Sequence, residues 1–262
     1  MSKDHCIENL GFSLEKGGAH SSRTMMFDEL SGLLSFLGSP TASKSDYCTA
    51  IKEQNCLAKR SSKTRDLTFR HLVDLYSLDV NIPIFKALVY FWSRDPDSRQ
   101  LLAILCAYCR DAILRQSAPL IQKTAIGSIV SRESMEQHID GSQPGRFSKA
   151  TLQSTAQNIN STWTKSGHLT GKVRKVRTNA IAAPASVSYA LLIGYLKGER
   201  GLSLFHTEYM KLLDCSVEKA IELAEEASRK GWIVFKRVGN VMEVVFPQLI
   251  TEVEMRSLHE PN

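Results

Sequence analysis

The feature that most constrains the fold is a stretch near the end of the chain, WIVFKRVGNVMEVVFP, at residues 232–247. Two runs of alternating apolar and polar residues flank Gly239 and Asn240, which is a strong signal for a β-hairpin with a two-residue turn. A helical pattern, SVEKAIELAEEASRKG, precedes it, with Ser216 suited to cap its start and basic residues at its end. The sequence therefore predicts a helix followed by a hairpin here.

The same order of patterns occurs earlier in the chain. A short helix is expected within residues 126–139, a longer one over 147–167, and a pair of short β-prone pieces over 168–177. Helix, turn, helix and a two-stranded wing is the order of a winged-helix domain. We therefore expect two winged-helix-like units with short β-hairpin wings, at residues 126–182 and 183–262.

The chain before residue 126 shows helical periodicity and no strand signal. It predicts a helical bundle over residues 26–125 and hence a mainly α protein. The expected helices cover residues 25–37, 43–57, 61–78, 83–94 and 101–117. Residues 1–25 are rich in Gly, Ser, His and charge without periodicity, which predicts a flexible N-terminal tail.

Composition places the chain among ordinary globular proteins, with 43% hydrophobic and 23% charged residues in 262. The beginning of the chain lacks the apolar core of a signal peptide, and the apolar runs fall short of the roughly 20 residues that span a bilayer. We expect a cytoplasmic protein with no membrane partner. Cys106 and Cys109 form a lone CxxC within an apolar helical pattern, which favours core packing over a zinc site.

Charge is distributed unevenly along the chain. Between Asp140 and Glu199 there is no acidic residue, while eight lysines and arginines fall inside this segment. The segment therefore carries +8 against +6 for the whole chain, so the rest sums to 6 − 8 = −2. A local excess of this kind indicates an acidic partner.

The helix expected within this acid-free segment has two different faces. Leu152, Ala156, Ile159 and Trp163 recur at helical spacing and predict one buried face. The opposite face carries amides and hydroxyls flanked by lysines, which are side chains that reach phosphates and base edges in a DNA groove. A polar helix that is merely solvated is the alternative, but such a face ordinarily mixes both signs of charge.

The basic wing supplies a second contact surface, since wings lie along a DNA backbone or enter a minor groove. A further basic cluster before and within the helix at 61–78 extends the footprint. The residues expected to contact double-stranded DNA are Arg146, Lys149, Gln153, Gln157, Asn158, Ser161, Lys165, Lys172, Arg174, Lys175 and Arg177, together with Lys59, Arg60, Lys63 and Arg65.

Signatures of catalysis are absent from the sequence. No GxxxxGK[ST], HExxH, GxSxG or GxGxxG motif occurs, and the seven histidines have no nucleophile or metal-ligand partner at a meaningful spacing. We expect no enzyme activity, cofactor, metal or small-molecule substrate.

The C-terminal helix differs from the basic one. It carries Glu218, Glu222, Glu225 and Glu226, so inserting it into a groove would bring carboxylates against phosphates. We expect this unit to pack within the protein or to dock a partner protein, and not to contact DNA through that helix.

Four stretches carry a resemblance to a known family: SSKTRDLTFRHLVDLY, STAQNINSTWTKSGHL, SVSYALLIGYLKGERG and RKGWIVFKRVGNVMEVVFP. With the order of elements over residues 26–250, they make the chain resemble the BrxA family, accessory proteins of BREX phage-resistance systems. The resemblance implies a non-enzymatic protein that binds double-stranded DNA beside other defence proteins, with an N-terminal part similar to the NusB fold.

Two further functions stay open from the sequence. One is a structural adaptor that holds partner proteins in a defence complex, with the basic segment meeting an acidic protein surface. The other is RNA binding, which a NusB-like bundle allows. Few aromatic residues accompany the basic segment, only Phe147 and Trp163, which disfavours recognition of single strands by base stacking.

Overall fold

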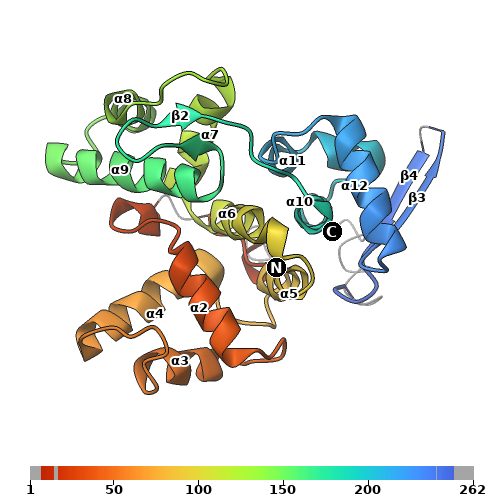
Figure 1. The fold of residues 1–262 in the computed structure, drawn as a ribbon, viewed down its shortest axis with the longest axis horizontal. Helices are drawn as coiled ribbons and strands as arrows, with labels where there is room; N and C mark the ends of the chain where they lie inside the picture. The colour runs from red at the N-terminus through yellow and green to blue at the C-terminus, as the bar shows by residue number, and fades with distance from the viewer. Residues whose placement is uncertain (1–6, 15–16, 240, 251–262) are drawn as a thin grey trace. The chain divides into compact units, whose positions relative to one another are not determined.

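A computed structural model describes residues 7–14, 17–239 and 241–250. The fold is mainly α-helical with two small antiparallel hairpins, as the sequence predicts (Figure 1). The chain divides into two compact units, the first comprising Met1–Phe85 and Cys106–Asn179 and the second comprising Lys86–Leu105 and Ala180–Asn262. Residues 86–105 of the expected bundle thus belong with the C-terminal part of the chain, because helix formation alone does not fix which helices pack together.

The elements of the first unit begin with a 3-10 turn, η1 (Ala19–Ser21). Its helices are α2 (Phe27–Leu37), α3 (Lys44–Lys52), α4 (Ser62–Tyr76), α7 (Ala112–Lys123), α8 (Arg132–Ser142) and α9 (Lys149–Lys165). Strands β1 (Leu169–Thr170) and β2 (Val176–Arg177) form its hairpin. Helices α5 (Pro83–Trp92) and α6 (Arg99–Arg110), with η2 (Pro96–Ser98) between them, run through the boundary between the two units.

Serine hydroxyls define where the helices of the first unit begin. The side chains of Ser61, Ser131 and Ser148 each accept a hydrogen bond from the backbone amide three residues later. This satisfies one amide that an isolated helix end leaves without an acceptor. Ser61 is one of the two caps that the sequence suggests for α4.

The expected helix over 101–117 is interrupted at Asp111. The Asp111 carboxylate accepts hydrogen bonds from the amides of Ile113 and Leu114 at 2.9 and 3.0 Å, so it ends α6 and caps α7. Cys106 and Cys109 are both buried in α6, which confirms core packing. The break is invisible in the periodicity because Asp111 occupies one polar position between two apolar runs.

The short helix expected within residues 126–139 is present only in its later part, as α8. Ser128, Ile129 and Val130 lie alongside β2: Arg177 N–H donates to Ser128 O, Val130 N–H donates to Lys175 O, and Ile129 pairs with Val176. Helix α8 begins only at Arg132. A β-branched pair, Ile129 and Val130, favours this extended backbone.

The N-terminal residues are packed where the structure describes them, contrary to the flexible tail that we expected. Phe12, Ala19, His20 and Met25 are all buried. The segment of residues 17–25 lies against α9, α4 and α7 through η1. The sequence did not predict this packing, because Gly, Ser and His give no periodic pattern.

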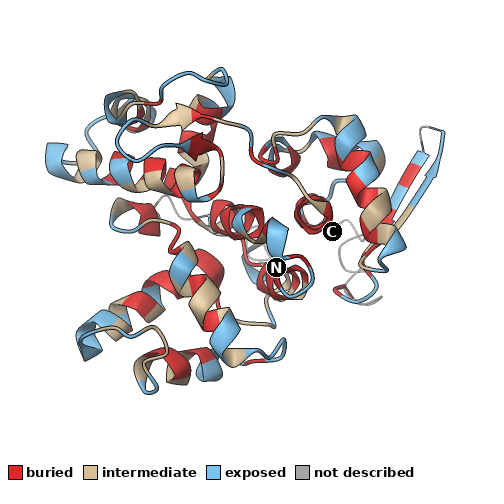
Figure 2. Cartoon of the chain, in the orientation of Figure 1, coloured by how far each residue is buried: buried red, intermediate tan, exposed pale blue. Residues whose placement is uncertain are grey.

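The second unit is built around α10 (Pro184–Leu196), every residue of which is buried (Figure 2). Its start is capped from elsewhere in the unit: Ala185 N–H donates to Asp95 Oδ2 at 3.1 Å and Ser186 N–H donates to Ser98 Oγ at 3.0 Å. Around it lie η3 (Gly201–His206), α11 (Glu208–Lys211) and α12 (Val217–Arg229). A helix that is apolar on all sides requires such enclosure.

The C-terminal hairpin has the register that the sequence predicts. Strands β3 (Val234–Val238) and β4 (Val241–Val245) pair antiparallel, with Val238 opposite Val241 at the turn. Asn240 of the expected turn lies outside the described residues. In α12, Ala220, Ile221, Ala224 and Ala227 are buried, as expected for its apolar face.

Candidate nucleic-acid interface

Helix α9 is held by its apolar side and presents a polar face. Ala156, Ile159 and Trp163 are fully buried, and Trp163 Nε1 donates to Ser117 Oγ of α7 at 2.8 Å. This confirms the buried face expected from spacing at these three residues, whereas Leu152, the fourth, is only half-buried near the start of the helix. The remaining positions of α9 lie on two flanks.

One flank of α9 carries the polar residues Lys149, Gln153, Gln157 and Ser161. They follow one another at steps of four, so they share one face of the helix. Lys149 and Gln157 are exposed, while Gln153 and Ser161 are half-buried. The ammonium group of Lys149 and the amides of Gln153 and Gln157 can donate hydrogen bonds to phosphate oxygens or to base edges. The Ser161 hydroxyl donates to the Gln157 carbonyl at 2.8 Å, so its oxygen is left to act as an acceptor.

The other flank of α9 is occupied by the protein itself. Asn158 Nδ2 donates to the backbone carbonyl of His20 at 3.2 Å. Lys165 Nζ forms an ion pair with Asp28 of α2 at 2.8 Å. These two residues, which the sequence places among the DNA contacts, therefore face the N-terminal segment and α2 and not the flank that carries Gln157.

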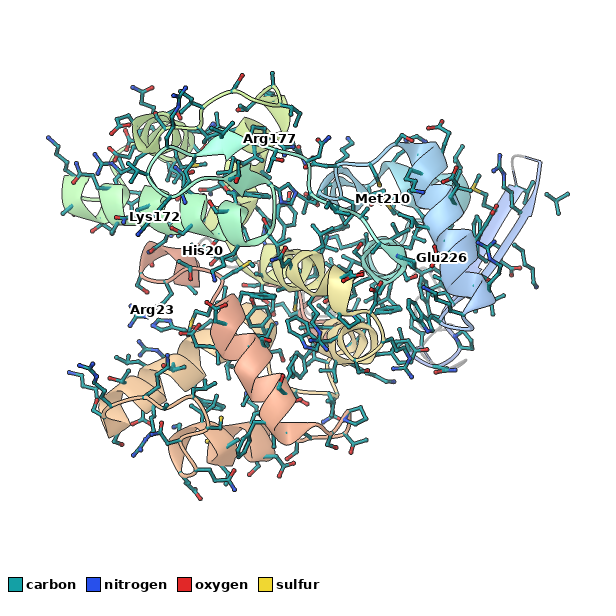
Figure 3. All side chains as sticks on the ribbon, in the orientation of Figure 1. His20, Arg23, Lys172, Arg177, Met210 and Glu226 are labelled. Atoms are coloured by element: carbon teal, nitrogen blue, oxygen red, sulfur yellow. The ribbon has the colours of Figure 1, made fainter. Side chains whose placement is uncertain are left out.

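Residues 169–177, which we call hairpin 1, bring basic side chains beside the first flank. Lys172 (Figure 3) and Arg174 are exposed, and Val173 between them has 95% of its surface exposed. Gly171 has a φ of +96°, and a Cβ there would lie 2.1 Å from the carbonyl oxygen of Arg174. The loop thus requires glycine at this position.

Lys175 is held partly inside hairpin 1. Its Nζ donates to the Gly171 carbonyl at 2.8 Å, across the same loop. Burial lowers the pKa of the Lys175 ammonium. The cation therefore closes the loop and still contributes positive charge to its surface.

Arg177 is a correction to the predicted set of DNA contacts. The residue is only 4% exposed, and its guanidinium donates to the carbonyls of Ile121 at 3.0 Å, of His168 at 3.3 Å and of Thr178. The Arg177 guanidinium therefore binds the carbonyls that connect α7 with hairpin 1 and does not face a ligand. Figure 3 labels both Arg177 and Lys172.

A concave surface joins the polar flank of α9 to hairpin 1. It encloses about 610 Å³ and is lined by residues 172–175, by Gln157, Asn160 and Ser161 of α9, and by residues 129–133. Sequence reasoning missed Arg132 in this lining, because Glu133 and Glu136 follow it. The Arg132 guanidinium pairs with both, at 3.1 and 2.9 Å, which offsets its charge.

Arg146 and the cluster near α4 lie outside this concave surface. The Arg146 guanidinium lies over the ring of Phe147, 4.9 Å from its centroid, and donates to Gln143. Lys59 pairs with Glu29 at 3.0 Å. Arg60 and Lys63 are exposed, and Arg65 is half-buried.

No family model matches the chain, and no curated protein matches it. Within the described residues, no group of three or more His, Cys, Asp and Glu side chains could hold a metal ion. In the same part of the chain, no helix is both long and apolar enough to cross a bilayer.

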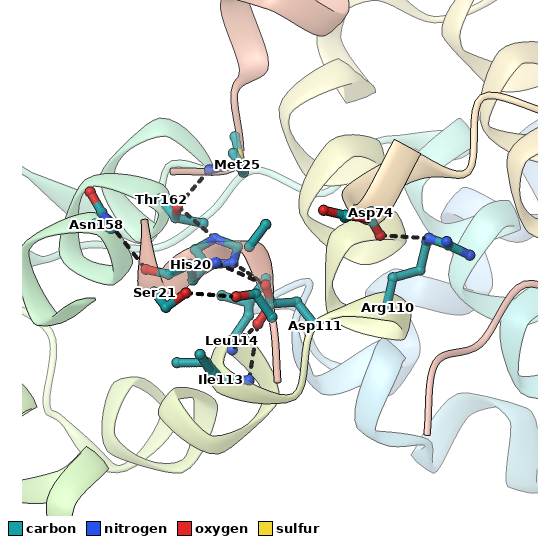
Figure 4. Close-up of polar contacts among 12 residues, drawn as sticks. His20, Ser21, Met25, Asp74, Arg110, Asp111, Ile113, Leu114, Asn158 and Thr162 are labelled. Atoms are coloured by element: carbon teal, nitrogen blue, oxygen red, sulfur yellow. Dashed lines mark hydrogen bonds and ion pairs between the residues drawn. The ribbon is translucent and has the colours of Figure 1, made fainter. Parts of the chain in front are cut away.

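A buried polar cluster holds the N-terminal segment against the other flank of α9, where Asn158 lies (Figure 4). His20 Nδ1 lies 2.8 Å from Asp111 Oδ2, and His20 Nε2 lies 3.0 Å from Thr162 Oγ1 of α9. Burial raises the pKa of the Asp111 carboxyl, but contact with His20 and with the amides of Leu114 and His20 outweighs burial and leaves that pKa below its ordinary value.

The same three side chains have the order of a carboxylate, an imidazole and a hydroxyl, which activates nucleophiles in hydrolases. Here the hydroxyl is not available, because Thr162 Oγ1 also accepts the amide of Met25 at 2.9 Å and both Thr162 and His20 are fully buried. The cluster therefore fastens residues 17–25 to α7 and α9. No sequence pattern links these residues, since they come from three distant segments.

Proposed function

We propose that the chain binds double-stranded DNA without catalysing a reaction, as an accessory protein of a BREX-type phage-defence system in the cytoplasm. The observation that carries the proposal is the flank of α9 with Lys149, Gln153, Gln157 and Ser161 beside the exposed cations of hairpin 1. The chain from residue 141 to 198 holds no carboxylate side chain that would oppose a phosphate backbone.

The connection of the elements supports a winged-helix interpretation of residues 112–177. Helix α7, the extended residues 128–130, helices α8 and α9, and hairpin 1 follow one another, and residues 128–130 pair with β2. In such a domain the second helix of the helix-turn-helix pair reads the major groove, which here is α9. The order α10, α11, α12 and β3–β4 suggests a second domain of the same kind. For the N-terminal helices, the NusB-like comparison remains part of the proposal.

The proposed contacts divide by chemistry. Gln153 and Gln157 reach base edges from α9, while Lys172, Arg174 and Lys175 neutralise backbone phosphates beside them. Arg60 and Lys63 extend the contact along the backbone. Because most of these groups contact phosphate, binding is strongly dependent on salt and weakly dependent on sequence.

An electrophoretic mobility-shift series tests this function. The full chain is titrated into duplex DNA, single-stranded DNA and RNA of matched length, each at a low and at a near-physiological salt concentration. We expect the highest affinity for the duplex and a marked loss of affinity at the higher salt. Preference for RNA would favour the RNA-binding alternative, and absence of any shift at low salt would contradict nucleic-acid binding altogether.

A structural-adaptor role is the second candidate, and features of the second unit favour it. Val238 and Val241 at the turn of β3–β4 are 80% and 74% exposed. Glu218 and Glu222 lie on the exposed side of α12. An exposed apolar tip beside an acidic helix suits a protein partner better than a phosphate backbone.

A further inference from the structure

A second polar pocket lies within the first unit, between α4 and the N-terminal segment. It encloses about 390 Å³, which lies within the usual size range of small-molecule sites. Arg70, His71 and Asp74 of α4 line one side, and Arg110 of α6 lines another. The N-terminal segment completes the wall with Ser13, Gly17, Gly18, Ala19, Ser21 and Ser22.

Arg110 is fixed in place by backbone acceptors. Its guanidinium donates to the carbonyls of Gly11 at 2.7 Å, Asp74 at 2.9 Å and Val73 at 3.2 Å. These bonds use three of its N–H groups, and a guanidinium carries five. The positive charge is therefore preorganised at the pocket wall, and N–H groups remain to meet a ligand.

Arg70 supplies a second cation without a carboxylate partner among the described residues. It is exposed on α4. Arg23 lies in the segment between η1 and α2 (Figure 3), and the charges of Arg23 and Arg70 both act on His71. Burial lowers the pKa of the His71 imidazole, and these two guanidinium groups lower it further.

One carboxylate opposes this positive charge. Asp74 Oδ2 lies 3.7 Å from His71 Nδ1, and the Asp74 side chain is 51% exposed at the rim. No hydrogen-bond partner of His71 Nδ1 is found among the described residues. The arginines outweigh Asp74, so the pocket combines an excess of positive charge with a fixed guanidinium donor.

We propose that this pocket binds a phosphate group carried by a nucleotide-sized ligand. Guanidinium groups form paired hydrogen bonds with phosphate oxygens, which a smaller halide cannot accept in the same way. The volume of about 390 Å³ exceeds what one phosphate fills, so it leaves room for a sugar attached to that phosphate. The phosphate belongs either to a free nucleotide or to the backbone of a bound duplex, since both present the same oxygens.

The test follows the His71 imidazole of the full chain by NMR during titration with inorganic phosphate, against sodium chloride at equal ionic strength. A bound phosphate offsets the charges of Arg23 and Arg70. We therefore expect a saturable change in the His71 signal and a rise in the pKa of His71. Chloride should give neither. A His71 signal that responds equally to both salts, or does not saturate, would overturn the proposal.

Matched variants separate the pocket from general charge. Arg70→Gln should weaken phosphate binding about tenfold, whereas Arg229→Gln, also an exposed arginine but on α12 and outside the pocket, should leave it unchanged. Asp74→Asn should strengthen binding by removing the opposing charge. Equal responses of Arg70→Gln and Arg229→Gln would refute a specific site.

Two further arms identify the source of the phosphate. A 5′-nucleoside monophosphate and a duplex without terminal phosphates are each titrated with the same readout. A response to the monophosphate alone assigns a free nucleotide, and a response to the duplex assigns a backbone phosphate. The double variant Arg174→Glu with Lys175→Glu should lose duplex binding and keep the response to inorganic phosphate. The proposal of a phosphate site is thus tested separately from the proposal of a DNA interface.

Discussion

Replacing Arg177 by Met is expected to destabilise the fold, although the neighbouring Arg174 tolerates the same change. The substitution removes the donors to the carbonyls of Ile121 and His168, both in buried residues. Each carbonyl keeps a backbone donor, from Thr124 for Ile121 and from Thr178 for His168, so neither acceptor is left unpaired. At about 0.5–1.5 kcal/mol for each lost hydrogen bond, the two together lower the free energy of unfolding by about 1–3 kcal/mol. Arg174→Met removes an exposed side chain, which changes that free energy by about 0.5 kcal/mol or less.

Urea unfolding followed by circular dichroism measures both variants, and duplex affinity is measured at a temperature where both are folded. We expect Arg177→Met to lower the unfolding midpoint and to retain duplex affinity. We expect Arg174→Met to leave the unfolding midpoint unchanged and to weaken duplex binding. A stable Arg177→Met protein that has lost duplex binding would show that Arg177 contacts DNA and that its buried position is not the one it occupies in the complex.

Three further outcomes follow from individual contacts. Contacts with His20 and with backbone amides hold the folded-state pKa of Asp111 below its ordinary value of 3.8. The stabilisation from the Asp111 carboxylate is therefore complete above that ordinary value and is lost as pH falls through the lower folded-state pKa, so Asp111→Asn should flatten the acid side of a plot of unfolding free energy against pH. Gly171→Ala should lower both stability and duplex affinity, because its Cβ would clash with the Arg174 carbonyl, and wild-type values for both would contradict the observed loop. Lys236→Glu with Arg237→Glu on β3 should leave duplex affinity within about twofold, and a loss like that of the hairpin 1 variants would place DNA on the second unit as well.

Local signals predicted the elements that local chemistry determines. The turn at Gly239 sets the register of β3–β4, Ser61 caps α4, and the spacing of Ala156, Ile159 and Trp163 defines the buried side of α9. In each case the residues that determine the structure lie within a few positions of one another. Their effect is therefore readable in the sequence.

The features that the sequence did not predict depend on contacts between distant segments. Asp111 divides α6 from α7 while it also binds His20, which lies 91 positions earlier. Arg177 alternates with valine like the other basic residues of hairpin 1, and alternation alone does not say which cation turns inward toward Ile121. Asn158 is likewise polar and helical, but the N-terminal segment occupies its side of α9.

The salt dependence of duplex binding, measured for the wild-type chain and for the double variant Arg174→Glu with Lys175→Glu, tests the central claim most directly. If four to six phosphates are neutralised, the slope of log affinity against log salt concentration is about −4 to −5 for the wild type. Loss of two phosphate contacts should reduce the magnitude of the slope by about 2 in a variant that unfolds like the wild type. A wild-type slope near zero, or equal slopes for the two proteins, would contradict DNA binding through α9 and hairpin 1.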